Sequence, residues 1–255
     1  MLLVIDVGNT NTVIGVYEND DLKHDWRIRT VRENTADEFN VLAQALFSDK
    51  GMETSAITKI VISSVVPSSV RILNAFCQRY LNLSPVWINP RSVKKLMPIL
   101  YSNPNEVGAD RIVNAVAAFK KHQQALIIID FGTATTFDAI TQKGEYLGGA
   151  ICPGVMISSE ALFQRASRLP RVEIFKAPEQ VIGKDTIESI QSGIIYGNAA
   201  MVDGMVSRMA REMDSALMII ATGGLAPLIA EVSQTIEYVD QSLTLEGLRI
   251  ISREI

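Results

Sequence analysis

The chain has 255 residues, of which 47% are hydrophobic and 20% charged, and its formal net charge is −4. This composition suits one large globular domain or two modest ones with a sizeable core. The mild negative charge argues against nucleic-acid binding, which needs a concentrated basic face.

The cysteine and histidine content argues against a disulfide framework and a zinc or iron site. Only Cys77 and Cys152 could form a disulfide, and two histidines leave few ligands for such a metal. The N-terminus predicts a strand containing Asp6 rather than a signal peptide, and no run of 18 apolar residues occurs. We therefore expect a cytoplasmic protein that makes no membrane contact.

The first 122 residues alternate between predicted strands and helices. A meander is expected from strands at 2–5, 12–17 and 23–29, with a turn at 18–21. The next segment, 35–47, has helical periodicity, and Thr35 with Glu38 forms the pattern of a capping box. Further elements are predicted as a strand at 59–66, a helix at 68–81, a short strand at 85–88 and an alanine-rich helix at 109–122.

The pattern then repeats. The stretch Leu126–Thr136 (LIIIDFGTATT) overlays Leu2–Thr12 (LLVIDVGNTNT) at a constant offset of 124, since 126 − 2 = 124. A second similarity pairs Ile60–Pro67 with Met218–Pro227, each an apolar strand followed by small residues and a proline. Duplication explains such self-similarity better than chance. The sequence therefore predicts an α/β protein of two similar halves, 1–120 and 121–255, each with a mixed sheet flanked by helices.

The repeated Asp-x-Gly motif is the first candidate site. A single copy is typical of a strand that ends in a turn, but two copies at equivalent positions favour a function. Glycine permits close backbone approach to a ligand, and the amides and hydroxyls of residues 9–12, or of Thr133, Thr135 and Thr136, supply donors for phosphate. The sequence contains neither a Walker loop nor the protein kinase motifs. It also lacks the G-x-G-x-x-G fingerprint after a strand, which argues against a nicotinamide oxidoreductase.

Two aspartates facing one polyphosphate would need cations. If Asp6 and Asp130 both lay at such a site, two negative charges about 5 Å apart at an effective dielectric of about 20 would repel by roughly 3 kcal/mol. Carboxylate and hydroxyl oxygens suit Mg²⁺ or an alkali ion. Bound cations are therefore expected with the nucleotide.

The second candidate site is Asn103–Arg111 (NPNEVGADR), before the alanine-rich helix. In one interpretation, Asp110 complements the helix dipole and Arg111 is a surface cation. In the other, Asp110 is a general base, Gly108 allows close approach of a substrate, and Arg111 holds an anionic group. The residues alone leave both interpretations open.

Two further segments contain many small residues. Leu147–Val155 (LGGAICPGV) is expected to be a turn-forming loop, and it resembles Thr222-Gly223-Gly224; both suit either close packing or nucleotide contact. A long helix is predicted to begin near Thr186 and continue over 194–208. Its small residues would allow close packing against another helix, including one of a second subunit.

Together these motifs carry a resemblance to known proteins. Two Asp-x-Gly units at the start of similar halves resemble the actin, hexokinase and heat-shock ATPase superfamily, which implies two duplicated ribonuclease-H-like (actin-like ATPase) domains. The finer set is similar to type III pantothenate kinases and spans nearly the whole chain: Asp6–Thr10, Asn103-Pro104, Gly108–Arg111, Asp130–Thr136, Gly148-Gly149, Pro153-Gly154, Thr186 and Gln191–Gly193.

The resemblance implies a role for each matching position. ATP would be bound by the first phosphate loop and Thr133, the loop comprising Asp6, Val7, Gly8, Asn9, Thr10, Asn11, Thr12 and Val13. Asp130 would bind a monovalent cation, K⁺ or NH₄⁺. Pantothenate would contact Tyr101, Gly108, Ala109, Asp110, Arg111 and Thr186, with Asp110 as proton acceptor and the site completed across a homodimer interface. One departure is Asp185, where the family more often has asparagine; its charge would slightly disfavour an anionic substrate.

The activity implied is ATP-dependent phosphorylation of pantothenate to 4'-phosphopantothenate, the first step of coenzyme A biosynthesis, with Mg²⁺ as a second cation. One alternative is another sugar or acid kinase of the superfamily, against which Gly108–Arg111 argues. A second is a non-catalytic regulatory relative, a transcriptional accessory factor that keeps the fold. Such a protein would be expected to lose Asp110 or the first loop, and both are present here.

Overall fold

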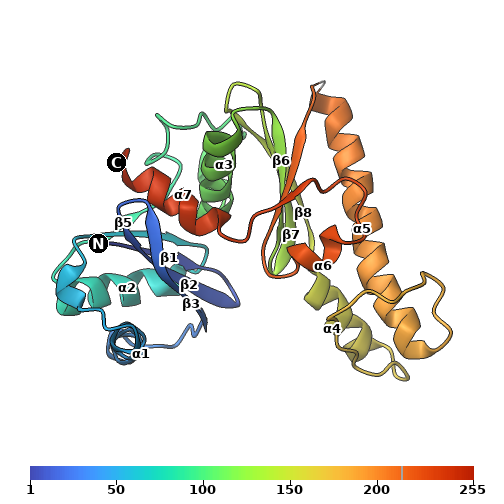
Figure 1. The fold of residues 1–255 in the computed structure, drawn as a ribbon, viewed down its shortest axis with the longest axis horizontal. Coiled ribbons are helices and arrows are strands. Elements are labelled where there is room, and N and C mark those ends of the chain that lie inside the picture. Colours follow the sequence, from blue (N-terminus) through green and yellow to red (C-terminus); the bar gives the residue numbers. More distant parts are fainter. Residues whose placement is uncertain (214) are drawn as a thin grey trace. The chain divides into compact units, whose positions relative to one another are not determined.

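The computed structural model describes residues 1–213 and 215–255. These residues form two compact units (Figure 1). The first unit comprises Met1–Ala117 and Leu243–Ile255, and the second comprises Ala118–Ser242.

The first unit contains a five-stranded sheet in the order β3-β2-β1-β4-β5. Its strands are β1 (Leu2–Val7), β2 (Asn11–Glu18), β3 (Asp21–Arg29), β4 (Lys59–Ser64) and β5 (Val86–Trp87). The three strands of the predicted meander pair antiparallel, whereas β1, β4 and β5 run parallel. This unit also contains α1 (Ala36–Asp49), α2 (Pro67–Tyr80), the first part of α3 (Ala109–His122) and two short 3-10 helices, η1 (Thr54–Ala56) and η2 (Pro104–Glu106).

The second unit repeats this topology, with the strand order β8-β7-β6-β9-β10. Its strands are β6 (Leu126–Phe131), β7 (Ala134–Ile140), β8 (Tyr146–Pro153), β9 (Met218–Thr222) and β10 (Tyr238–Val239). Strand directions also match, because β6, β7 and β8 pair antiparallel while β6, β9 and β10 run parallel. The helices of this unit are α4 (Val155–Arg165), α5 (Thr186–Met213) and α6 (Ala226–Ala230), while α7 (Leu243–Ser252) belongs to the first unit. The predicted duplication is therefore confirmed.

Helices α1 and α2 cover one face of the first sheet, and local sequence patterns determine where each of them begins. The predicted capping box forms at α1: the Glu38 amide donates to Thr35 Oγ1 (3.2 Å), and the Thr35 amide donates to Glu38 Oε2 (2.8 Å). Pro67 begins α2, where its missing amide hydrogen costs nothing. Phe39 of α1 and Phe76 of α2 pack edge to face and lie in one buried apolar cluster with residues 3, 5 and 7 of β1.

The opposite face of the same sheet is covered by α7, which corrects the expected division at residue 120. Helix α7 contacts β1, β2 and β4, and its apolar side chains Leu243, Leu248 and Ile251 are completely buried. A Cβ built on Gly15 of β2 would lie 3.2 Å from Leu245 Cδ1, so this helix packs closely on the glycine. Residues 243–255 therefore belong to the first unit and not to the half predicted as 121–255, because their apolar stripe packs on this sheet.

The glycine-rich segment 147–155 also differs from expectation. Most of it is strand β8, paired antiparallel with β7, and not a turn-forming loop. Gly148, at φ +141, lies opposite the point where the pairing of β7 shifts by one residue. The glycines thus accommodate an irregularity in an edge strand.

Within the described part of the chain, no helix is long and apolar enough to cross a bilayer.

Candidate active site

The first Asp-x-Gly motif forms the hairpin between β1 and β2. The amide of Gly8 donates to the carbonyl of Asn11 (3.0 Å) and closes the turn, while Asn9 and Thr10 are exposed at its tip. The Thr30 hydroxyl donates to the Gly8 carbonyl (2.8 Å) and lies 2.9 Å from the hydroxyl of Thr12. Thr30 therefore braces the turn, and the buried Thr12 hydroxyl contacts Thr30. The exposed residues of the turn are those at its tip.

Asp6 precedes this turn and lies between two neighbouring strands. It is opposite Val13 of β2 and beside Ser63 of β4, whose hydroxyl donates a hydrogen bond to the Asp6 carboxylate. The pKa of Asp6 is raised to about 7, mainly because the carboxylate is removed from water and also because of the charge of Asp110, while Ser63 and Arg27 oppose the shift. A positive charge bound near Asp6 would therefore lower the pKa of its carboxyl group and favour the ionised form.

Asp110 lies in the first turn of α3. Its Oδ1 accepts a hydrogen bond from the Arg111 amide (2.8 Å). A Cβ built on Gly108 would come within 2.5 Å of the same oxygen, so the carboxylate rests directly on the Gly108 backbone. Burial raises the pKa of Asp110, although the amide bond and the positive charge of Arg111 oppose this. The structure therefore brings Asp110 near Asp6, with both pKa values raised.

The other members of the second motif take different positions. Arg111 is only 8% exposed, so the surface-cation interpretation is wrong. Ala109 is buried at the start of α3, and Tyr101 is half-buried in the preceding loop. A 3-10 turn, Pro104–Glu106, leads into this helix, and Asn103 caps it by accepting from the Asn105 amide (3.2 Å).

The second Asp-x-Gly motif forms the corresponding hairpin, between β6 and β7. The Gly132 amide donates to the Ala134 carbonyl (3.1 Å). Phe131 pairs with Thr135, whereas Val7 pairs with Thr12, so this turn is one residue shorter. The predicted constant offset of 124 is therefore wrong beyond the turn, where it falls to 123 (135 − 12). Thr133 is exposed at the tip.

Asp130 lies beside oxygens that suit a hard cation. It is opposite Thr222 of β9, and a Cβ built on Gly223 would come within 2.6 Å of Asp130 Oδ1 and 2.7 Å of the Phe131 carbonyl oxygen. Gly223 has φ +92, which favours glycine. No group of three His, Cys, Asp or Glu side chains gathers as a metal site within the described ranges. An ion here would therefore be held by one carboxylate together with hydroxyl and carbonyl oxygens, a donor set that fits a hard cation.

The strand that follows contains two buried hydroxyls, of which that of Thr136 belongs to the residue paired with Asp130. The Oγ1 atoms of Thr135 and Thr136 are buried and have no hydrogen-bond partner in the structure. Buried hydroxyls are normally satisfied, so the unsatisfied Thr136 hydroxyl, on the same sheet face as Asp130, points to an interaction that a ligand completes, whereas Thr135 projects from the other face.

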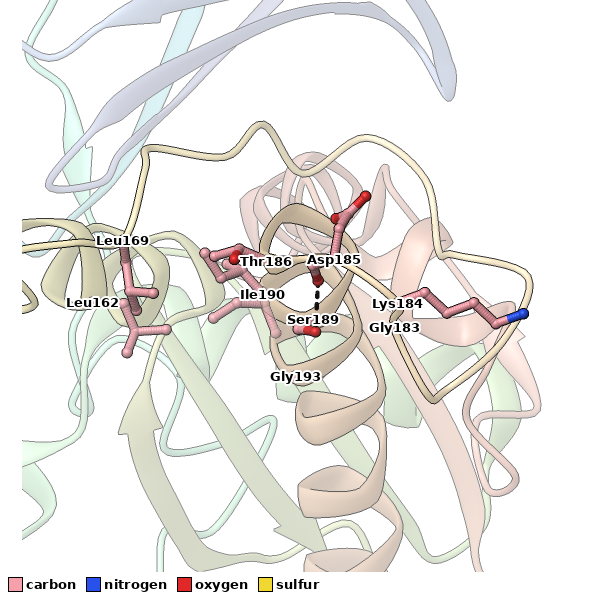
Figure 2. Close-up of a pocket in the computed structure, with 10 residues that line it drawn as sticks. Leu162, Leu169, Gly183, Lys184, Asp185, Thr186, Ser189, Ile190 and Gly193 are labelled. Atoms are coloured by element: carbon pink, nitrogen blue, oxygen red, sulfur yellow. Dashed lines mark hydrogen bonds between the residues drawn. The ribbon is translucent and has the colours of Figure 1, made fainter.

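Thr186, by contrast, lies at the exposed start of α5. It lines an open pocket of about 650 Å³ with Leu162 and Ile190. Figure 2 shows Asp185 and Thr186 at the first turn of the helix, where the Ser189 hydroxyl donates to the Asp185 carbonyl (2.7 Å), while Lys184 extends away from Leu162. Asp185, the residue that departs from the family pattern, also lines this pocket.

Sequence reasoning missed three side chains that support the first hairpin. Ser63 binds Asp6, Thr30 binds the Gly8 carbonyl, and Arg32 Nη2 donates to Asn9 Oδ1 (3.0 Å). The similarity of Ile60–Pro67 to Met218–Pro227 gave one signal, because it aligns the strand end at Ser63 with that at Thr222. Thr30 and Arg32 have no equivalent signal.

Comparison with solved structures defines the class of fold. One similar structure is a ROK family glucokinase from Streptomyces griseus in complex with glucose and AMPPNP, with a TM-score of 0.54, 13% identity, and coverage of 99% of this chain and 100% of that one. Another, described as a Baf family transcriptional activator from Campylobacter jejuni, has a TM-score of 0.59, 19% identity, and coverage of 99% and 98%. The fold is thus that of the actin-like ATPases and sugar kinases, as expected.

Sequence comparison defines the family. The type III pantothenate kinase family model matches residues 2–208. A type III pantothenate kinase from Desulforapulum autotrophicum is 70% identical over 99% of this chain and 96% of that protein, and one from Myxococcus xanthus is 54% identical over 98% and 97%. The chain belongs to the type III pantothenate kinase family and is a kinase.

Proposed function

We propose that this kinase transfers the terminal phosphoryl group of ATP to pantothenate, forming 4'-phosphopantothenate, the first step of coenzyme A biosynthesis. The observation that carries this proposal is the arrangement of Asp110 beside Asp6 at the first hairpin, within a chain of this family. It places a base of raised pKa next to a turn with exposed phosphate donors. The two free cysteines, Cys77 and Cys152, fit the proposed cytoplasmic location.

Asp110 is the proposed general base. It accepts the proton of the primary hydroxyl of pantothenate as that oxygen attacks phosphorus in line with the leaving group. Two features orient its carboxylate: the Arg111 amide holds Oδ1, and the Gly108 backbone leaves no room for it to turn inward. A pKa raised by burial brings the base nearer the operating pH, which favours proton transfer.

Each of the two hairpins is proposed to supply residues that bind ATP. The first contributes Asp6–Val13, of which the exposed tip offers amides and side chains to phosphate oxygens. The second contributes Thr133. Since phosphoryl transfer depends mainly on positioning and electrostatic stabilisation, a first hairpin braced by Thr30 fits this task.

Asp130 is the proposed ligand of a monovalent cation, K⁺ or NH₄⁺. Its support is the donor set formed with the Phe131 carbonyl and the space that a side chain at 223 would fill. Mg²⁺ is proposed to arrive with the nucleotide. Such cations supply positive charge that offsets the phosphates and the carboxylates of Asp6 and Asp130.

Pantothenate is proposed to lie against Tyr101, Gly108, Ala109, Asp110 and Arg111, with Thr186 supplied across a homodimer interface. Support for a dimer comes from exposed apolar side chains on α4, on the following loop and at the start of α5: Met156, Ile157, Leu162, Phe163, Phe175, Val181, Ile182 and Ile187. Monomeric proteins rarely expose so much apolar surface in one region. Sedimentation of the wild type and of Ile182→Asp, whose side chain is 81% exposed, tests this: a monomeric wild type would contradict the dimer.

The activity is tested by ADP formation with ATP, Mg²⁺ and pantothenate, first in K⁺ and then in Na⁺. We expect pantothenate-dependent turnover in K⁺ and much less in Na⁺. Asp110→Asn should lower turnover by about 10²–10⁴-fold while leaving the fold intact. No pantothenate-dependent signal in K⁺ would refute the proposed activity, and near-normal turnover of Asp110→Asn would remove that residue from the role of base.

The alternatives are decided by the same assay. The similarity to the Campylobacter jejuni protein named as a transcriptional activator is at 19% identity and concerns the fold alone. A regulatory relative would bind nucleotide without turnover, and a sugar or acid kinase would respond to another acceptor in a substrate panel. The retained Asp110 and first hairpin favour the pantothenate kinase.

A further inference from the structure

Arg27 lies on β3 in a row of residues that crosses the first sheet. Asp6 pairs with Val13, Val13 pairs with Arg27, and Ser63 flanks Asp6 on the other side. Directly paired residues project from the same face of a sheet. Arg27 and Asp6 are therefore on one face, separated by two strand spacings, or about 10 Å between Cα atoms.

This face is open at the row that contains Arg27. One row further back, Gly15 is covered by Leu245 of α7, and Val4 on the adjacent strand is completely buried. At the next row toward the hairpin, Val13 is half-buried and Arg27 is exposed. Helix α7 thus leaves this face of the sheet accessible at the end where Asp6 lies and where the hairpin between β1 and β2 begins.

Arg27 is also uncommitted. Its guanidinium forms no ion pair or hydrogen bond with another side chain in residues 1–213 or 215–255. The charged groups that face it are Asp25 and Arg29 from its own strand, Asp6 from β1 and, beyond Asp6, Asp110 from α3. Its positive charge acts on Asp6, whose pKa it lowers. An exposed arginine without a hydrogen-bonded or ion-paired side chain, on the same sheet face as Asp6 and near the proposed phosphate-binding turn, is placed to bind an anion.

We propose that Arg27 binds the terminal phosphate of the nucleotide and offsets the charge that Asp6 and Asp110 place around it. This inference rests on the proposed function, since it assigns a further residue to the same ATP site. The planar guanidinium can donate two parallel hydrogen bonds to phosphate oxygens, which a point charge such as lysine cannot reproduce. Contact with the terminal phosphate distinguishes ATP from ADP.

The test compares Arg27→Gln with the wild type in nucleotide binding and turnover. Calorimetry without pantothenate should show AMPPNP binding weakened by about tenfold or more, because a charge-assisted contact is lost, and ADP binding changed less than about twofold. The kcat/KM for ATP should fall by about 10²-fold, and Arg27→Lys should recover part of this loss. Equal weakening of AMPPNP and ADP, or no change in either, would overturn the proposal.

Two controls separate this role from others. Lys23→Gln removes one positive charge from the same strand at a position where Lys23 contacts Glu18 (3.4 Å) and Asp21 (3.6 Å), and it should leave both affinities unchanged. If Arg27 acted only through protonation of Asp6, the loss in Arg27→Gln would disappear between pH 7 and pH 9; that result would also overturn the proposal. Because binding is measured without pantothenate, the outcome is independent of whether the wild type phosphorylates it.

Discussion

The carboxylates of Asp6 and Asp110 lie close enough in the first unit for the negative charge on Asp110 to raise the pKa of Asp6. One comes from the end of β1 and the other from the first turn of α3. Two like charges in a partly dehydrated site oppose each other's ionisation, so the pair binds protons or cations more tightly than isolated aspartates would. This coupling makes the site sensitive to pH before any ligand binds.

Asp6→Asn should therefore stabilise the protein in a pH-dependent way. Asp6 has a pKa of about 7 in the folded protein against 3.8 as its ordinary value, so folding favours the protonated form. The folded state holds that proton more tightly, and stability is lost as pH rises from about 4 to about 7. The free energy of unfolding of Asp6→Asn should exceed that of the wild type by a margin that widens by about 1–3 kcal/mol from pH 5 to pH 8.

Urea unfolding followed by tryptophan fluorescence measures this margin in the relevant unit, because both tryptophans, Trp26 and Trp87, lie in the first unit. Asp110→Asn is a useful companion, since removal of its charge lowers the pKa of Asp6 and should reduce the pH dependence. A margin that stays constant between pH 5 and pH 8 would show that Asp6 titrates in its ordinary range.

Gly108→Ala should impair catalysis through Asp110. The new Cβ would come within 2.5 Å of Asp110 Oδ1, so the carboxylate must turn away from the Arg111 amide. Misplacement of a catalytic group on this scale lowers kcat by about 10–10²-fold. The free energy of unfolding should change by less than about 1 kcal/mol, because an aspartate side chain can rotate to relieve the contact.

A double-mutant cycle identifies the route of this effect. In the Asp110→Asn background the base is already absent, so Gly108→Ala should cost less than about twofold in addition. If the two losses multiplied instead, Gly108 would act on the reaction independently of Asp110, for example by contacting pantothenate itself.

Much of the fold could be predicted because it depends on local patterns. The two Asp-x-Gly strands, the meander and the capping box at Thr35 and Glu38 all follow from periodicity and capping chemistry. Packing partners are not local. The sheet against which residues 243–255 pack is the one with a complementary apolar face, and no local motif in the sequence indicates which sheet that is.

The candidate site could also be predicted only in part, because some of its residues lie in motifs and others are brought in by strand pairing. The motifs identified Asp6, Asp110 and Asp130, but they gave neither the row that joins Asp6 to Arg27 nor the hydroxyl of Ser63. Cross-strand neighbours are set by pairing register, and a change of one residue in a turn alters the register of the whole strand. The shorter second hairpin illustrates this, since Thr135 and not Thr136 occupies the position equivalent to Thr12.

Gly223 and Gly224 offer a matched pair for testing the proposed cation site. Gly223 has φ +92, and a Cβ there would come within 2.6 Å of Asp130 Oδ1 and 2.7 Å of the Phe131 carbonyl oxygen. At Gly224 a Cβ would meet nothing within 4 Å. Gly223→Ala should therefore lower the free energy of unfolding by about 1–3 kcal/mol and displace two proposed cation ligands, whereas Gly224→Ala should change it by less than about 1 kcal/mol.

The measurement pairs thermal unfolding by circular dichroism with turnover at increasing K⁺ concentration. If Asp130 and the Phe131 carbonyl hold the ion, Gly223→Ala should need at least about tenfold more K⁺ for half-maximal turnover, the size of effect expected when about 1.4 kcal/mol of binding is lost. Gly224→Ala should keep the wild-type requirement. A Gly223→Ala enzyme that is destabilised and yet responds to K⁺ as the wild type does would separate the two roles, because the strain would then act on the strand end alone and the ion would bind elsewhere.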